Sequence, residues 1–288
     1  MIWLSGKELA RERRKVLRQK LELLPQPLCL AVILVGNNPA SEIYVTAKER
    51  AAKKAGLHSR VLRLPEDTSA NALTLLIDGL NQNPGVHGVL LQLPLPPHLD
   101  MARHLQEIDP QKDVDGFHPV NVGKMTLGLP ALTPCTPLGI MHLIRHYQIP
   151  LEGKNVAVVG KSNIVGRPMA QLLMHAGATV TICHSLTAHL PEHLRNADII
   201  ISAAGSPDLI GPECLGRPVY LIDVGINRLA DGAVCGDMQT QNLATHPHCL
   251  GLTPVPGGVG PMTIQVLLEN TLYAGSGSRI DQTLPLHP

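Results

Sequence analysis

The stretch that decides the fold is VAVVGKSNIVGRPMAQLL, residues 156–173. A short apolar run ends in Gly160, and a helix is predicted to begin near Arg167, which is the order strand, tight turn, helix. In a dinucleotide-binding turn, glycines allow close backbone approach and the helix N-terminus faces the pyrophosphate. The usual G-x-G-x-x-G pattern is incomplete, because Ser162 replaces the middle glycine and the spacing to Gly166 is unusual. The stretch favours a nucleotide site, with an ordinary strand–helix turn as the alternative.

The end of the following strand indicates which dinucleotide fits. An NAD site places Asp or Glu about 20 residues further on, where the carboxylate binds the ribose 2′-hydroxyl. Here VTICHSLT, residues 180–187, has no carboxylate. Such a strand end leaves room for a 2′-phosphate, which Lys161 and Ser185, helped by Arg167, are placed to bind. The sequence therefore predicts an NADP site.

Short apolar runs alternate with amphipathic stretches along the whole chain, which is typical of an α/β fold with mostly parallel strands. Asn38 and Pro39 form a helix start, and Gly56 a helix end. Residues 109–137 are predicted as loop and linker, and the tail 276–288 as mobile. The predicted strands are 29–35, 59–64, 86–93, 155–159, 178–183, 198–203, 219–224 and 249–253, and the clearest helices are 39–55, 69–81 and 260–275.

Length and composition narrow the class of protein. A chain of 288 residues is long for one core, so two domains are expected. The net charge of +1 gives no reason to expect nucleic acid or membrane as a partner. The six cysteines are scattered and the N-terminus has no signal-peptide pattern, which predicts a cytoplasmic protein with reduced thiols. No metal site is predicted, because the His142/His146 pair lacks the accompanying glutamate.

Four residues in the first part of the chain are candidates for chemistry. Tyr44 and Lys48 lie four apart, on one face of a predicted helix. Gln92 stands at the carboxyl end of a strand, where α/β proteins bind ligands. Asp115 precedes a glycine. Each also has an ordinary interpretation, as a helix surface residue, a turn cap or a turn residue. A Tyr-x-x-x-Lys pair occurs in short-chain dehydrogenases too, but there it follows the glycine loop.

Together, six strings resemble one family, the bifunctional methylenetetrahydrofolate dehydrogenase/cyclohydrolases of one-carbon metabolism. They are YVTAK (44–48), VLLQLPLP (89–96), DVDGFHPVNVG (113–123), GKSNIVGRPMAQLL (160–173), DVGINR (223–228) and TPVPGGVGPMT (253–263). The resemblance implies NADP-dependent oxidation of 5,10-methylenetetrahydrofolate, followed by hydrolysis of the methenyl product to 10-formyltetrahydrofolate. It also implies a homodimer.

The resemblance assigns roles to particular residues. Tyr44 would stack on the folate, Lys48 would act as the catalytic base or water activator, Gln92 would orient Lys48, and Asp115 would hold the pterin. The cofactor positions would be Gly160, Lys161, Ser162, Ser185 and Ile226. The segment from Pro256 to Thr263 would line the other wall of the cleft, with Pro256, Gly257, Gly258 and Thr263 as its named residues.

One departure from the family concerns Lys161, where the family usually has arginine. Lysine keeps the charge but loses the planar fork that grips phosphate, so the NADP preference is expected to be softer. CHSLT also lacks a basic residue that often follows the serine.

The resemblance implies two domains with the active site in the cleft between them. Residues 1–118, completed by a C-terminal helix over 263–288, would form the folate-binding catalytic domain. Residues 119–262 would form a Rossmann-like NADP domain. The alternatives are a dehydrogenase without the hydrolase step, a noncatalytic nucleotide sensor, and a shikimate- or amino-acid-type dehydrogenase.

Overall fold

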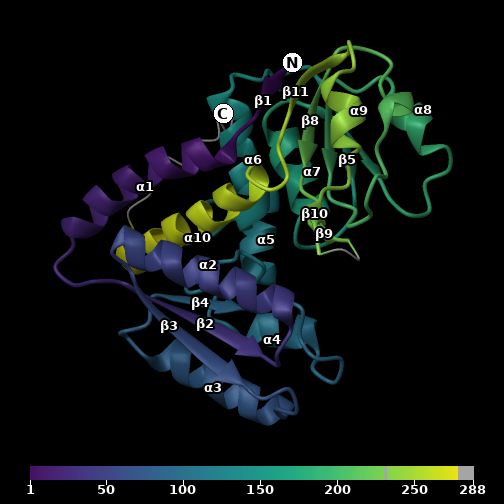
Figure 1. The fold of residues 1–288 in the computed structure, drawn as a ribbon. Coiled ribbons are helices and arrows are strands. Elements are labelled where there is room, and N and C mark those ends of the chain that lie inside the picture. The colour runs from purple at the N-terminus through teal and green to yellow at the C-terminus, as the bar shows by residue number, and fades with distance from the viewer. Residues whose placement is uncertain (230–231, 278–288) are drawn as a thin grey trace. The chain divides into compact units, whose positions relative to one another are not determined.

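The computed structural model describes residues 1–229 and 232–277. The chain divides into two compact units, each built around a parallel sheet (Figure 1). Of the described residues, the three-stranded unit contains Glu12–Cys135 and 264–277. The six-stranded unit contains Met1–Arg11 and Thr136–Thr263. The predicted mixed α/β class is confirmed.

The three-stranded unit has the sheet order β3-β2-β4 with every pair parallel. Its strands are β2 (Cys29–Val35), β3 (His58–Leu64) and β4 (Gly88–Leu91). Alternate residues of β2 pack with α3 (Ala70–Gln82) in one hydrophobic core, while α2 (Pro39–Ala55) covers the other face (Figure 1). Central strands buried on both faces read as continuous apolar runs, which explains the sequence CLAVILV.

Helix α2 begins and ends where the sequence predicted. The side chain of Asn38 accepts hydrogen bonds from the backbone N–H groups of Ala40 and Ser41, and Pro39 is the first helical residue. Gly56 ends the helix in the left-handed conformation, with φ +94°. These local signals fix the segment that carries Tyr44 and Lys48.

The prediction of an unbroken loop over 109–137 was wrong. Helix α5 (Pro119–Thr126) lies within this range, and α6 (Cys135–His146) begins near its end. His118 caps α5 by accepting from the N–H of Val120. Proline favours a first helical turn as much as a loop, so composition alone misled the prediction. Helix α4 (Met101–Glu107) precedes this region.

The six-stranded unit has the order β1-β11-β8-β7-β5-β6, all parallel. The five predicted strands match to within one or two residues, whereas β1 is a two-residue strand that was not predicted. Ile2 and Trp3 of β1 pair with residues almost 250 positions away, for which no local signal exists. The strands are β1 (Ile2–Trp3), β5 (Asn155–Val159), β6 (Thr179–Cys183), β7 (Ile199–Ser202), β8 (Val219–Asp223) and β11 (Cys249–Leu252).

The remaining elements complete the two units. They are α1 (Gly6–Glu22), α7 (Gly166–His175), α8 (Leu190–Leu194), a 3₁₀ turn (Pro212–Cys214), the antiparallel pair β9 (Asn227–Arg228) and β10 (Val234–Cys235), α9 (Thr240–Ala244) and α10 (Val259–Ser276). The predicted helix 260–275 corresponds to α10, whereas the predicted mobile tail 276–288 and the last part of the helix 263–288 implied by the resemblance lie largely outside the described residues. None of the helices in the described ranges has the length and apolar character needed to cross a bilayer.

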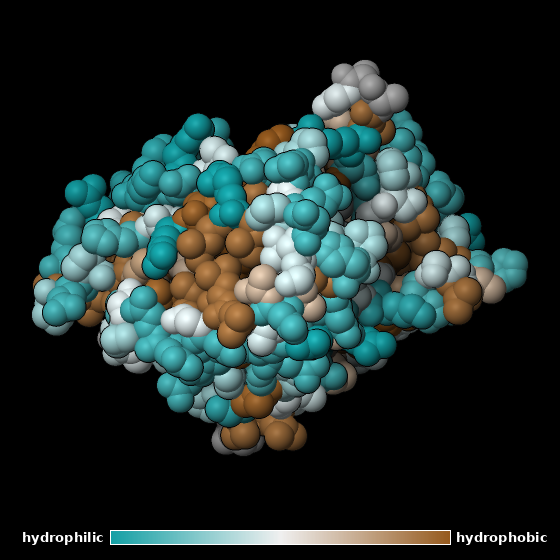
Figure 2. Space-filling view, turned by 90° about the horizontal axis from the view of Figure 1, so that it is seen from below, coloured by the Kyte–Doolittle hydropathy of each residue, from teal (hydrophilic) through white to brown (hydrophobic). Residues whose placement is uncertain are grey.

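The unit limits differ from the expected domain limits in two places. Residues 1–11 lie with the six-stranded unit, because β1 joins its sheet. Residues 119–135 lie with the three-stranded unit, where buried Asn270 donates to the carbonyl oxygens of Val114 and Thr133. The face shown in Figure 2 is mainly hydrophilic, with hydrophobic residues gathered in patches.

Candidate active site

The order of the strands locates a ligand crevice in the six-stranded unit. Strand β5 has β6 on one side and β7 on the other, and the order β6-β5-β7-β8-β11 is that of a doubly wound sheet. In such sheets the strand order reverses next to the first strand, here between β5 and β7. Ligands bind at this reversal point, outside the carboxyl ends of the strands. The loops after β5 and β7 therefore flank the expected crevice.

The loop after β5 leaves no room for side chains at its two glycines. Gly160 has φ +127°, and a Cβ there would overlap the carbonyl oxygen of Ala203. A Cβ on Gly166 would overlap the carbonyl oxygen of Gly160. Ser162 Oγ accepts hydrogen bonds from the N–H groups of Val165 and Gly166, at 3.1 and 3.3 Å. The serine thus closes the loop in front of α7 without the missing glycine, which fits a dinucleotide cradle.

The candidate 2′-phosphate residues follow two neighbouring strands. Val159 of β5 pairs with Cys183 of β6, and Gly160 N–H donates to the Cys183 carbonyl oxygen at 2.8 Å. Lys161 follows Gly160 directly, Ser185 lies two residues after Cys183, and both are exposed. Ile226, in the loop after β8, is 47% exposed, which is high for an isoleucine. The charge of Lys161 and the hydroxyl group of Ser185 are suited to binding a phosphate. The apolar side chain of Ile226 is suited to contact with a ring of the cofactor.

Lys48 and Gln92 meet in the three-stranded unit. Lys48 Nζ donates to Gln92 Oε1 at 3.0 Å, and both side chains are 9% exposed. Gln92 Nε2 donates to the Leu93 carbonyl oxygen at 2.7 Å, and Gln92 N–H donates to the Ile33 carbonyl oxygen. The amide nitrogen is therefore held by a backbone carbonyl, so the amide oxygen faces the lysine. Tyr44 lies one turn before Lys48 on α2 and is half-buried.

Asp115 belongs to the same region as Lys48. Burial raises the pKa of Asp115, and the nearby Asp113 carboxylate adds to this effect, whereas attraction to Lys48 and the neighbouring Cys135 thiol lower the pKa. The side chain keeps partial access to solvent although protein surrounds it. The structure thus brings Lys48, Gln92 and Asp115 into one region, while their roles are still predictions.

The segment after β11 is packed tightly against the start of α1. The Gly257 carbonyl oxygen accepts from the N–H groups of Gly6 and Lys7, each at 3.1 Å. A Cβ on Gly258 would lie 2.7 Å from the Thr253 Cβ, and the peptide before Pro256 is cis. Thr263 shares a hydrogen bond of 3.0 Å with Thr136 through their hydroxyl groups. These contacts give the segment a fixed shape; that it lines the substrate site is still a prediction.

Comparison with known proteins decides the family. The catalytic-domain profile of the tetrahydrofolate dehydrogenase/cyclohydrolases matches residues 4–115, and their NAD(P)-binding-domain profile matches residues 134–278. The chain belongs to this family. The bifunctional protein FolD of Streptococcus thermophilus is 48% identical over 277 residues, which cover 95% of this chain and 97% of the relative.

Solved structures of the family agree with the fold. A bifunctional FolD from Campylobacter jejuni, 47% identical, superposes with a TM-score of 0.94 and covers 96% of this chain and 99% of its own. A FolD from Trypanosoma brucei, 34% identical, has a TM-score of 0.92 over 96% of this chain and 98% of its own, and was solved with NADP and an inhibitor.

Two residues near Asp115 were missed by the sequence prediction. Cys135 is 1% exposed, and its thiol donates to the Val114 carbonyl oxygen at 3.2 Å. Burial and the Asp115 carboxylate raise the pKa of this thiol well above its ordinary value, so it stays protonated. Asn270 is fully buried on α10. An asparagine in the apolar run VLLENTL was an available signal, because buried amides need fixed partners.

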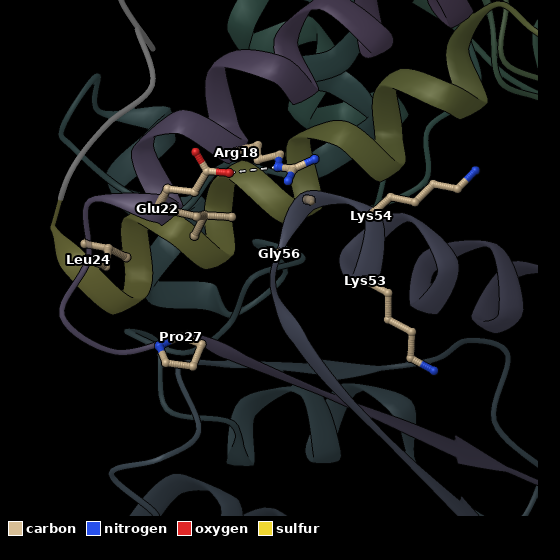
Figure 3. A pocket seen from close by; sticks show the side chains of 9 residues that line it. Arg18, Glu22, Leu24, Pro27, Lys53, Lys54 and Gly56 are labelled. Atoms are coloured by element: carbon tan, nitrogen blue, oxygen red, sulfur yellow. Dashed lines mark hydrogen bonds and ion pairs between the residues drawn. The ribbon is translucent and has the colours of Figure 1, made fainter.

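A pocket of about 580 Å³ lies elsewhere in the three-stranded unit (Figure 3). Arg18 and Glu22 point toward one another at its edge and form an ion pair of 2.9 Å. Lys53 is paired with Glu49 at 2.8 Å. The lining contains none of the predicted site residues. Because ion pairs already engage Arg18 and Lys53, we assign the pocket no ligand.

Proposed function

We propose that this chain oxidises 5,10-methylenetetrahydrofolate with NADP and hydrolyses the 5,10-methenyl product to 10-formyltetrahydrofolate, and that Lys48 carries the hydrolysis. The observation that supports this assignment is the buried hydrogen bond from Lys48 Nζ to Gln92 Oε1. A buried lysine fixed by an amide whose nitrogen is held by a backbone carbonyl is oriented for chemistry, whereas a solvated helix lysine is not.

The oxidation and the hydrolysis require different contributions from the protein. NADP, when bound, supplies the hydride acceptor for the oxidation. This first reaction leaves a cation on the substrate and requires no protein base, only correct placement of the methylene carbon. In the hydrolysis, water adds to that cation and gives up a proton, and one carbon–nitrogen bond then opens. Lys48 would act as the base or activator for that water, with Gln92 holding its Nζ in place.

Asp115 and Tyr44 would hold the folate. The amino-pyrimidine edge of the pterin offers hydrogen-bond donors, which a carboxylate accepts. Asp115 is suited to this role because Asp113, rather than Asp115, makes the hydrogen bonds of the adjoining turn, to His118 N–H and the Asn121 side chain. The half-buried ring of Tyr44 would stack on the folate.

The six-stranded unit would hold the cofactor at the carboxyl ends of its strands. Backbone N–H groups of the Gly160–Gly166 loop and the N-terminus of α7 would bind the pyrophosphate, with Ser162 shaping that loop. Lys161 and Ser185 would bind the 2′-phosphate, and Ile226 would contact a ring. Pro256, Gly257, Gly258 and Thr263 would line the substrate site.

Replacement of Lys48 by methionine tests the proposal. Lys48→Met keeps the length of the side chain but removes the amine, so hydrolysis of the methenyl substrate should fall by about 100-fold or more, the usual scale of general acid–base catalysis. Reduction of NADP with the methylene substrate should fall less. Lys53→Met, on the same helix but paired with Glu49 at the surface, is the matched control and should keep both rates. An equal small effect of Lys48→Met on both reactions would remove Lys48 from the mechanism.

We also infer a cytoplasmic homodimer, from the family and from the cysteines. All six cysteines are free thiols, as suits a reducing compartment. Light scattering after size-exclusion chromatography tests the dimer.

A further inference from the structure

Asp237 is a fully buried carboxylate at the carboxyl edge of the six-stranded sheet. Its Oδ2 accepts from the Ser202 hydroxyl at 3.0 Å and from the N–H groups of Ala204 and Gly205 at 2.8 and 3.2 Å. Its Oδ1 accepts from Ser206 N–H at 3.0 Å. One side chain thus holds three successive backbone N–H groups of the loop after β7.

The same carboxylate also reaches the loop after β8. Asn227, next to Ile226, donates from Nδ2 to Asp237 Oδ1 at 2.9 Å and to the Gly236 carbonyl oxygen at 3.0 Å. The two loops come from neighbouring strands but are separated in sequence by about 20 residues. Asp237 therefore ties together two segments that local backbone interactions do not join.

A second carboxylate fixes the position of Asp237 itself. Asp223, 1% exposed at the end of β8, accepts from the N–H groups of Gly225 and Asp237 through Oδ1, at 2.9 and 3.0 Å. Its Oδ2 accepts from Met238 N–H at 2.9 Å. A Cβ on Gly225 or Gly236 would collide with one of these carboxylates. The arrangement therefore leaves little freedom in the backbone around Asp237.

The loop that Asp237 holds borders the cofactor loop. Ala203 N–H donates to the Val159 carbonyl oxygen at 2.7 Å, and a Cβ on Gly160 would overlap the Ala203 carbonyl oxygen. Residues 203–206 thus form the β7 side of the crevice between β5 and β7. Successive backbone N–H groups often form an anion site. Here the Asp237 carboxylate already accepts from the N–H groups of residues 204–206. The loop after β5 is therefore the one left to bind the cofactor phosphates.

We propose that Asp237 is a positioning residue for the dinucleotide: its carboxylate holds the loops after β7 and β8 in the shape that receives the cofactor. The proposal rests on NADP binding by the six-stranded unit and is independent of the role of Lys48. A purely structural Asp237 would affect stability alone. A positioning Asp237 affects cofactor affinity in molecules that remain folded.

Asp237→Asn separates the two roles, because it keeps the shape of the side chain while presenting an NH₂ group to backbone donors. Asp198→Asn is the matched control: Asp198 accepts from Asn155 N–H at 2.9 Å and pairs with Arg217, at the amino ends of the same sheet. NADP titration should give a dissociation constant raised about tenfold or more for Asp237→Asn, as expected when charged hydrogen bonds are lost. The KM for NADP should rise in parallel, while kcat at saturating NADP and the affinity for a folate analogue stay close to those of the wild type.

Asp198→Asn should lower the melting temperature and leave the NADP affinity unchanged. If Asp237→Asn melts earlier but binds NADP like the wild type, the proposal is wrong. If the wild type itself fails to bind NADP, the proposed function fails instead. Should Asp237→Asn not fold, Ser202→Ala and Asn227→Ala each remove one donor to the carboxylate. Weaker NADP binding by both variants would support the positioning role, and wild-type binding by both would overturn it.

Discussion

Asp113 and Asp115 are two carboxylates in one short stretch that interact with different partners. Asp113 is 1% exposed and accepts from His118 N–H and Asn121 Nδ2, at 2.8 and 2.9 Å. Burial raises its pKa, and these hydrogen bonds lower it again. Asp115 interacts instead with Lys48 and Cys135. The ordinary turn role considered for Asp115 in the sequence is thus performed by Asp113.

Exchange of each carboxylate for an amide should give opposite results. Asp115→Asn should weaken binding of a folate analogue by about tenfold, since a charge-assisted hydrogen bond is lost, with little change in melting temperature. Asp113→Asn should destabilise the fold by about 1–3 kcal/mol, because buried donors lose their acceptor, while the folded fraction still binds folate. Calorimetric titration beside a melting curve distinguishes the two, and normal folate binding by Asp115→Asn would contradict the assignment.

Lys161 should set the choice between NADP and NAD. Lys161→Ala should reduce the ratio of kcat/KM for NADP over NAD by about 10- to 100-fold, which corresponds to a charge-assisted phosphate contact of about 1.5–3 kcal/mol. Lys161→Arg should raise the ratio, because guanidinium binds phosphate with two parallel hydrogen bonds. Lys154→Ala, just before β5 at the opposite edge of the sheet, is the control. An unchanged ratio in Lys161→Ala would exclude Lys161 from the phosphate site.

The sequence allowed some of these residues to be predicted but not others. Lys48, Gln92 and Asp115 lie in recognisable strings of the family. Asp237 does not stand out in CGDMQ, since its meaning comes from donors such as Ala204 and Asn227, which only the folded sheet brings close. Cys135 could be read as a buried thiol, but its contact with Asp115 depends on packing between distant segments.

At the scale of elements, local signals decided which predictions succeeded. Helix α2 carries a cap, a first-turn proline and a terminal glycine, and its predicted bounds of 39–55 are those observed. Helix α5 has only eight residues, in a stretch rich in turn formers, and was predicted as loop. Strand β1 has two residues whose pairing is entirely long-range. Short elements without periodicity are determined by their neighbours in the fold.

The cap of α2 should contribute measurable stability. Asn38→Ala removes the acceptor for two backbone N–H groups and should lower the free energy of unfolding by about 1 kcal/mol. Asn38→Asp retains an acceptor and should cost little. Since the three-stranded sheet holds the rest of α2, kcat for both reactions should stay near wild type. Urea unfolding and steady-state rates measure these effects, and equal stability of the alanine and aspartate variants would contradict the role of the cap.

At the scale of the whole molecule, both units place their candidate residues by one rule. Gln92 follows β4, Gly160 follows β5, Ser185 follows β6 and Ile226 follows β8. Parallel sheets gather the loops after their strands at one edge, so residues far apart in sequence meet there. The alternation of apolar and amphipathic stretches therefore predicted both sheets and the edge that carries the candidate residues. It did not predict the limits of the units, which depend on long-range pairing such as that of β1.

Asp223 should make the stability of the folded chain depend on pH. Burial, with a further contribution from Asp237, raises the pKa of Asp223 from 3.8 to about 6, although three backbone N–H groups lower it in part. Between these values the folded chain holds a proton that the unfolded chain has released. This group therefore stabilises the fold fully below pH 3.8, and the contribution is lost as the pH rises to about 6.

Asp223→Asn cannot ionise and should lack this dependence. The free energy of unfolding of the wild type, minus that of the variant, should fall by about 2 kcal/mol from pH 4 to pH 7. The difference between the two proteins is the relevant quantity, because the other titrating groups are common to both and cancel. Urea unfolding at several pH values, on protein without NADP, measures it. Parallel stability curves for the two proteins would show that Asp223 is already ionised at low pH, held by its three N–H donors.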